Sequence, residues 1–131
     1  MANLMPEEKY GFKPLPDEMT FGEQLLHISE NLGWLTAFYI TISKNPITKA
    51  ATQVHQKEDI IQVLKKTYDF AISALKSFEV TRLANTVSFF AGPKTNLQII
   101  NLISDHQTHH RAQIIVYLRL NDIKPPEYVG W

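Results

Sequence analysis

The sequence contains no cysteine, and this absence limits the chemistry that its side chains can carry out. A disulfide, a cysteine nucleophile and a thiolate metal ligand are all excluded. Any metal ion must be held by His, Asp or Glu. Any thiol chemistry must use a thiol that a cofactor or substrate brings.

An excess of charge of either sign is also missing, because thirteen basic residues balance thirteen acidic residues. A large phosphate-binding surface needs clustered Lys and Arg, so we expect no nucleic-acid partner. No run approaches the roughly 18 apolar residues of a membrane-spanning helix. The N-terminus lacks the basic and apolar regions of a secretory signal. We therefore expect a cytoplasmic protein without a membrane partner.

The length and composition are those of one globular domain, which we assign to residues 1–131. The chain has 131 residues, of which 44% are hydrophobic and 20% are charged. These proportions are typical of a domain with a hydrophobic core of its own.

Apolar periodicity predicts a first long helix over about residues 20–43. Its apolar residues alternate in steps of four and three, which keeps them on one stripe of a helix: Phe21, Leu25, Ile28, Leu32, Leu35, Tyr39 and Ile42. Thr20 and Glu23 form a capping-box pattern at its start. Asn45-Pro46 ends it, because the residue before proline avoids the helical region.

Two further long helices are predicted, and they make the chain all-α. The second covers about residues 58–77, with an apolar stripe at Ile61, Leu64, Tyr68, Ala71, Leu75 and Phe78. Residues 80–94 are mixed, and Ala91-Gly92-Pro93 indicates a loop. The third helix covers about residues 95–121, with Thr95 and Gln98 as its capping pair.

Three long amphipathic helices do not close a four-helix bundle. The N-terminal segment, residues 1–13, offers only one short candidate turn. We therefore expect the fourth wall to be a short element, to be lost from this chain, or to come from another copy. An incomplete bundle of this kind favours a homodimer.

The third predicted helix carries two histidines with the spacing of metal ligands. His106 and His110 are four positions apart, so they share one helix face with Cβ atoms about 5–6 Å apart. Two imidazoles at that separation can reach one ion at about 2.0–2.1 Å per bond. Gln113 and Tyr117 continue the same face. His109 points about 100° away from His110 and is interpreted as a surface or supporting residue.

A third histidine, His27, lies at the edge of the apolar stripe of the first helix. Asn31, Trp34 and Phe38 follow it at helical spacing and form a mixed stripe. Glu30 is an alternative carboxylate ligand. The residues alone leave a plainer interpretation open, with all three histidines as packing or surface residues. We assign no role to His55, which lies in a predicted loop.

Two segments resemble the signatures of the DinB-like (YfiT-like) superfamily. Phe-Gly-Glu-Gln-Leu-Leu-His-Ile, residues 21–28, is similar to its early metal-bearing segment. Asp-His-Gln-Thr-His-His-Arg-Ala-Gln, residues 105–113, resembles its second signature, and the similarity covers nearly the whole chain. The resemblance implies a four-helix bundle in which His27, His106 and His110 bind one divalent ion, zinc or nickel.

The chain departs from the family pattern at two places. Ala112 replaces the glycine of the family's Arg-Gly-Gln, so its methyl group narrows any space that the glycine leaves. Only Ala2 to Met5 precede Pro6, where the family has a whole helix. We expect the native gene product, or its oligomer, to contain a longer first helix.

The resemblance implies a metal-dependent enzyme of the thiol-transferase or hydrolase type acting on a small molecule. Three imidazoles leave a coordination position open, which is typical of a catalytic zinc site. Trp34, Phe38 and Tyr117 are expected to line an apolar pocket, and Arg111 or Gln113 to orient a polar group. The missing cysteine is compatible with a low-molecular-weight thiol as cofactor. Two alternatives are a non-catalytic, dimerising metal-binding module of the stress response and a helical interaction domain without metal.

Overall fold

Three long helices make up most of the structure, as the periodicity predicts. A computed structural model describes residues 1–41 and 43–128. Helix α1 spans Phe21–Leu35 and continues into a π-helical segment, Thr36–Thr41. Helix α2 spans Lys57–Lys76, and helix α3 spans Asn96–Leu120. The all-α prediction is confirmed.

Both predicted capping boxes are present, and they fix where α1 and α3 begin. The hydroxyl of Thr20 accepts a hydrogen bond from the backbone N–H of Glu23, whose carboxylate accepts one from the backbone N–H of Thr20. Thr95 and Gln98 make the same reciprocal pair at the start of α3. Each pair satisfies backbone donors that have no partner within the first turn.

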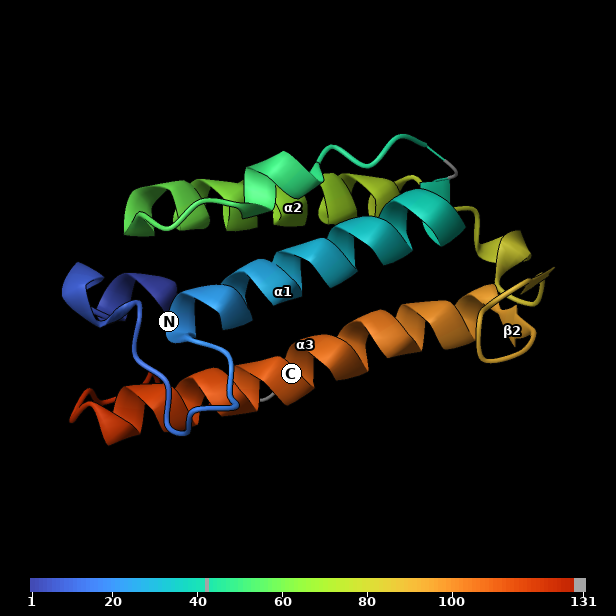
Figure 1. Ribbon diagram of the computed structural model, residues 1–131. Coiled ribbons are helices and arrows are strands. Elements are labelled where there is room, and N and C mark those ends of the chain that lie inside the picture. The colour runs from blue at the N-terminus through green and yellow to red at the C-terminus, as the bar shows by residue number, and fades with distance from the viewer. Residues whose placement is uncertain (42, 129–131) are drawn as a thin grey trace.

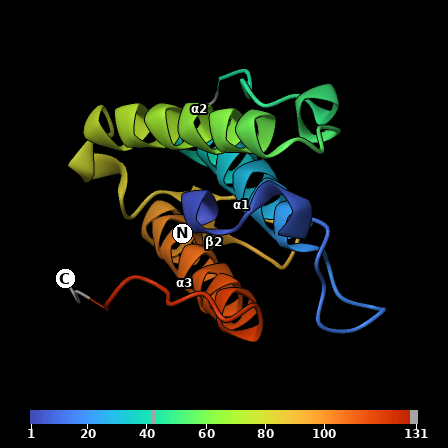
Figure 2. The same cartoon turned by 90° about the vertical axis from the view of Figure 1, so that its left-hand side faces the viewer.

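Helix α1 is the central element, and it packs against both α2 and α3 (Figures 1 and 2). Its buried apolar residues therefore lie on more than one side: Phe21, Leu25, Leu26, Ile28, Leu32 and Leu35. Helix α3 runs antiparallel to α1, so the middle of one faces the middle of the other (Figure 1). This arrangement brings residues about 80 positions apart into contact, such as His27 and His106.

The N-terminal segment covers one end of the core with two short turns, Ala2–Leu4 and Glu7–Lys9. Met5 and Tyr10 are buried against α1, and the Tyr10 hydroxyl donates a hydrogen bond to the carbonyl of Ala2. Figure 2 shows these turns at the end of the molecule where α3 finishes. The segment thus supplies a short element and does not form a long fourth helix.

Burial along α2 differs from the predicted stripe. The residues that α2 buries lie one position earlier in most turns: Ile60, Val63, Thr67, Ala71 and Ala74. Of the predicted stripe, Tyr68 and Leu75 are 38% and 37% exposed. Small residues at the contact allow α1 to approach α2 closely. Leu64 and Tyr68 of α2 instead line the side between α2 and α3.

The connection from α2 to α3 is a short turn and a minimal hairpin. After the turn Val80–Arg82, β1 (Thr86–Val87) pairs with β2 (Lys94–Thr95) in antiparallel register. Gly92 in the predicted loop has a φ of 92°, a conformation that glycine adopts without strain. Within the described residues, no helix is both long and apolar enough to cross a membrane.

Candidate metal centre

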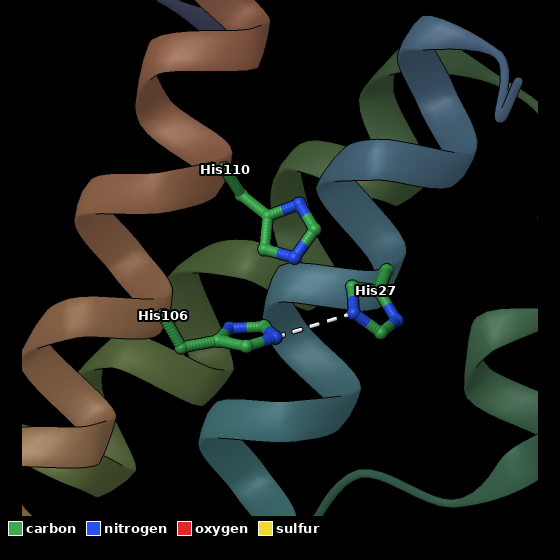
Figure 3. A group of neighbouring side chains, drawn as sticks. All are labelled: His27, His106 and His110. Carbon is green, nitrogen blue, oxygen red and sulfur yellow. Dashed lines mark hydrogen bonds between the residues drawn. The ribbon is translucent and has the colours of Figure 1, made fainter.

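Three histidines from two helices meet between α1 and α3. His27 extends from α1, and His106 and His110 extend from successive turns of α3 (Figure 3). One nitrogen from each ring lies within 4.8 Å of the other two, so the three can serve one ion. The spacing of four predicted that His106 and His110 would share a face, and the fold brings His27 opposite them.

The closest pair of nitrogens has the separation expected for two ligands of one ion. Nε2 of His106 lies 3.2 Å from Nε2 of His27. Two nitrogens bound at about 2.0–2.1 Å to a tetrahedral ion are about 3.3 Å apart. Glu30, the alternative carboxylate ligand, is exposed and does not belong to this cluster.

Two glutamines hold the ring of His110. Its Nδ1 lies 2.7 Å from Oε1 of Gln24 and 3.0 Å from Oε1 of Gln113. Both partners are amide oxygens, which only accept hydrogen bonds, so Nδ1 carries the proton. Nε2 then keeps a free lone pair toward the other histidines. Orientation of a metal-binding imidazole through its other nitrogen is the usual arrangement in metal sites.

Gln113 also links His110 to the neighbouring histidine. Its amide nitrogen donates to Nε2 of His109 at 3.0 Å. His109 is exposed, as its helical position predicts, and it lies outside the cluster of ligand atoms. It therefore contacts a residue that supports His110.

The surroundings favour neutral imidazoles. Burial, together with the smaller effects of the neighbouring His110 and His27, lowers the pKa of His106 to about 4. Burial also lowers the pKa of His110, with added effects of His27 and His109. A neutral ring offers a lone pair, so at neutral pH these two side chains are in the form that binds metal.

Two buried polar atoms near this interface have no hydrogen-bond partner among the residues that the structure describes. They are Nδ1 of His106 and Oδ1 of Asn31, each with less than 1 Å² exposed. Asn31 follows His27 by one helical turn on the same face of α1. His106 thus lacks the support that the two glutamines give to His110.

An open depression is lined by His27, one of the three histidines. Its volume is about 430 Å³, and its wall includes the acidic residues Asp17, Glu18, Glu23 and Glu30 and the basic residue Lys13. Four carboxylates against one ammonium give this depression a negative potential, which attracts cations.

Trp34 and Phe38 lie away from the histidines, in an aromatic group beside the hairpin. The Trp34 ring contacts Tyr39, Phe89 and Phe90, and Phe38 is 64% exposed. Their helical positions put them about 10 and 16 Å along the axis from His27. Trp34 and Phe38 therefore share a helix face with His27 but contact different residues.

Tyr117 is buried in the core near the N-terminal segment. Its ring contacts Phe12 and Phe21, and its hydroxyl donates to the carbonyl of Met19 at 2.6 Å. Burial raises the pKa of this hydroxyl. The hydroxyl thus holds the segment that leads into α1 against α3.

Arg111 lies on a different side of α3, about 100° around the helix from His110. It lines a groove, which we call the α2/α3 groove, whose floor and walls include Leu25, Ile28, Leu64, Tyr68, Gln107 and Arg111. The residues expected to surround one pocket thus lie in three places. Trp34 and Phe38 lie beside the hairpin, Tyr117 lies in the core near the N-terminal segment, and Arg111 lies in the α2/α3 groove. Of the five residues expected near the metal, Gln113 is the one with a hydrogen bond to a histidine of the cluster.

Gln24 was not identified from the sequence, although it makes the shortest contact to His110. It is 2% exposed, and a glutamine so deeply buried needs a polar partner. Its position three residues before His27 places both on one face of α1. That spacing is the signal that could have identified it.

The fold is that of a known class of helical protein. The family model described as the DinB superfamily matches residues 1–114. The chain belongs to the DinB superfamily.

Individual relatives agree with this assignment at the level of the fold. An uncharacterized protein of Bacillus subtilis (strain 168), YjoA, is 24% identical over 126 residues, covering 91% of this chain and 78% of that protein. The crystal structure of a DinB-like protein from Bacillus cereus matches with a TM-score of 0.82 and 22% identity, over 98% of this chain and 86% of the other. The YjoA crystal structure matches with a TM-score of 0.78 and 17% identity, over 97% and 85% of the two chains.

Proposed function

We propose that this protein binds one divalent metal ion, zinc or nickel, through His27, His106 and His110, and that the site serves a metal-dependent reaction. The observation that carries the proposal is the convergence of three ring nitrogens within 4.8 Å across two helices. Among the described residues, no further His, Asp or Glu belongs to this group. A ligand set of three is typical of catalytic zinc sites, whereas structural sites usually have four protein ligands.

The side chains fit a metal ion in their protonation and orientation. His106 and His110 are neutral at neutral pH, and Gln24 and Gln113 hold the proton of His110 on Nδ1. When bound, an ion in this ligand set supplies Lewis acidity to a thiol or a water that fills its remaining position. The carboxylates beside His27 favour the entry of cations into the centre.

The reaction class that we propose is thiol transfer or hydrolysis on a small molecule. The chain has no cysteine, so the thiol would come from a low-molecular-weight cofactor. The depression beside His27, of about 430 Å³, offers space for a small substrate next to one of the three ligands. The alternative is a non-catalytic metal-binding module that dimerises, with the same three histidines as ligands.

Metal content tests the first half of the proposal. We expect elemental mass spectrometry of untagged protein, purified and then incubated with zinc or nickel, to find about one equivalent per chain. The His106→Ala protein should retain little metal, because two imidazoles bind far less tightly than three. His55→Ala removes a histidine outside the cluster and should keep the full equivalent. Equal metal content in the His106→Ala and parent proteins would refute the site.

Turnover separates the enzyme from the non-catalytic module. The metal-loaded protein is assayed with chlorodinitrobenzene and N-acetylcysteine for thiol transfer, and with nitrophenyl acetate for hydrolysis. Activity that disappears in His106→Ala and persists in His55→Ala supports catalysis. Full metal loading without turnover of these substrates, together with a dimer in light scattering, favours the alternative.

A further inference from the structure

Two amide side chains of α1 flank His27 on the helix face that meets α3. Gln24 lies three positions before His27 and Asn31 lies four positions after it, so all three share one face. The two histidines of α3 are also spaced by four. Because α3 runs antiparallel to α1 (Figure 1), the amide before His27 meets the later histidine of α3. The amide after His27 comes level with the earlier one.

Contacts in the structure fix this register. Oε1 of Gln24 lies 2.7 Å from Nδ1 of His110, and the ring centres of His27 and His110 are 4.7 Å apart. One turn forward on α1 leads from His27 to Asn31. One turn back on the antiparallel α3 leads from His110 to His106. The pair Asn31 and His106 is therefore the counterpart, one turn along, of a pair that is in contact.

Both members of this pair have a polar atom without a hydrogen bond. Oδ1 of Asn31 and Nδ1 of His106 each have less than 1 Å² exposed, and neither has a partner among the described residues. A buried polar atom without a partner is costly, and such atoms are few in native structures. Oδ1 is an acceptor, and a ring nitrogen that carries a proton is a donor. The two atoms are thus complementary once the proton of His106 is on Nδ1.

Metal binding determines where that proton lies. Nε2 of His106 lies 3.2 Å from Nε2 of His27 (Figure 3), and a hydrogen bond between them needs a proton on one of the two nitrogens. When both nitrogens bind an ion through their lone pairs, neither can keep a proton. A neutral imidazole has one ring proton, which in His106 must then be on Nδ1. Binding thus turns Nδ1 of His106 into a buried donor.

From this arrangement we propose that Asn31 is the positioning residue of His106 in the metal-bound protein, with its Oδ1 accepting a hydrogen bond from Nδ1–H. The proposal rests on the metal site proposed above. A rotation of the Asn31 side chain makes the contact, and the pairing of two unpartnered atoms favours it. Asn31 then orients His106 through the nitrogen that does not bind metal, as is usual in metal sites. Gln24 supports the other histidine of α3 in the same way.

Zinc affinity measures this support. Competition between the full chain and a chromogenic chelator gives the dissociation constant for zinc alone. Asn31→Leu removes the acceptor with little change in side-chain volume, and loss of such a partner should weaken the affinity by about 10–100-fold. Asn31→Ala removes the acceptor without adding apolar volume and should show a similar loss. Asn101→Leu, at an exposed position of α3, is the matched control and should bind zinc as the parent does.

Rescue and spectroscopy distinguish positioning from general packing. Asn31→Asp retains an acceptor and should bind zinc at least as tightly as the parent, because a hydrogen bond to a carboxylate is stronger. Long-range proton–nitrogen correlation of the histidine rings reports which nitrogen carries the proton. In the zinc-loaded parent we expect a protonated Nδ1 on His106, with its proton shifted downfield by the hydrogen bond. In Asn31→Leu this proton should move upfield.

Other results overturn the proposal, and they can be told apart from failure of the metal site. If the parent and Asn31→Leu bind zinc equally tightly, the metal site stands and Asn31 has no part in it. Equal losses in Asn31→Leu and Asn31→Asp, with the Nδ1 proton of His106 unshifted, would reduce Asn31 to a packing residue. No zinc in the parent would remove the site itself, and with it the role of Asn31.

Discussion

The two sides of α3 carry different kinds of polar group, although the residues alternate along the same turns. His106 and His110 face α1, where other protein groups surround them and two glutamines hold one of the rings. Gln107 and Arg111, one position later, face a groove in which a donor and a charge lack protein acceptors. Different packing partners explain the difference: α1 covers one side closely, and no long helix among the described residues covers the other.

The largest effect should come from loading the histidine side with metal. An ion at a thousand times its dissociation constant raises the free energy of unfolding by about 4 kcal/mol, since it binds the folded chain. We expect zinc to raise the melting temperature of the parent and of Arg111→Gln alike, and to leave His27→Ala nearly unchanged. A similar rise in His27→Ala would mean that the ion binds elsewhere.

A smaller effect on the same side should follow from removing the support of His110. Gln24→Leu takes away the acceptor at 2.7 Å, and loss of such a partner weakens metal affinity by about 10–100-fold. Competition with a chromogenic chelator measures this change. Gln107→Leu is the matched control, because it removes a glutamine from the groove side of α3, the helix that carries His110. Equal losses in the two variants would contradict the distinction between the sides.

In the metal-free protein, the pH dependence of the free energy of unfolding should come from the histidine side of α3 and not from the groove side. The pKa of His106 is about 4 in the folded chain and about 6.5 when unfolded, so the unfolded chain binds more protons between these values. The free energy of unfolding should therefore fall as the pH drops from about 6.5 towards 4. Urea unfolding with chelator at pH 7 and pH 5 should show a smaller drop in His106→Gln than in the parent.

Arg111→Gln provides the comparison for this titration. The guanidinium of Arg111 stays charged between pH 7 and pH 5 and so does not contribute to the titration. The free energy of unfolding of Arg111→Gln should therefore drop by as much as that of the parent. If His106→Gln lost as much stability as the parent between the two pH values, burial of this ring would not be the cause.

The smallest effect should come from the groove side. Tyr68→Phe removes the hydroxyl that donates to Gln107, and such a hydrogen bond contributes about 0.5–1.5 kcal/mol. Because Tyr68 is 38% exposed, water can replace part of the bond, and we expect the lower end of that range in urea unfolding. Metal affinity should not change. A loss of metal binding in Tyr68→Phe would show that the two sides of α3 are coupled.

Local patterns predicted the helices well because their signals lie within a few residues. The apolar period, the two capping boxes and Gly92 each act over one or two turns, and all four features are present in the structure. The pair His106 and His110 belongs to the same category, since a spacing of four fixes a shared face. Residues 42 and 129–131, which include Ile42 of the predicted stripe, lie outside the described residues.

Contacts between helices were predicted less well because they depend on which faces meet. The stripe of α2 was placed about one residue off, since the small residues Thr67, Ala71 and Ala74 allow the closer approach to α1. Trp34 and Phe38 share a helix face with His27 but meet the hairpin aromatic residues instead. Gln24 gave no local signal beyond its spacing from His27.

The sequence by itself determined the three helices, the shared face of His106 and His110, and the exclusion of thiol ligands, because each follows from residue type and short-range spacing. Only the tertiary structure decided that His27 completes the cluster and that Gln24 orients His110. It also decided that Arg111 faces a groove and not the histidines. These outcomes depend on the antiparallel packing of α1 on α3, which joins residues about 80 positions apart.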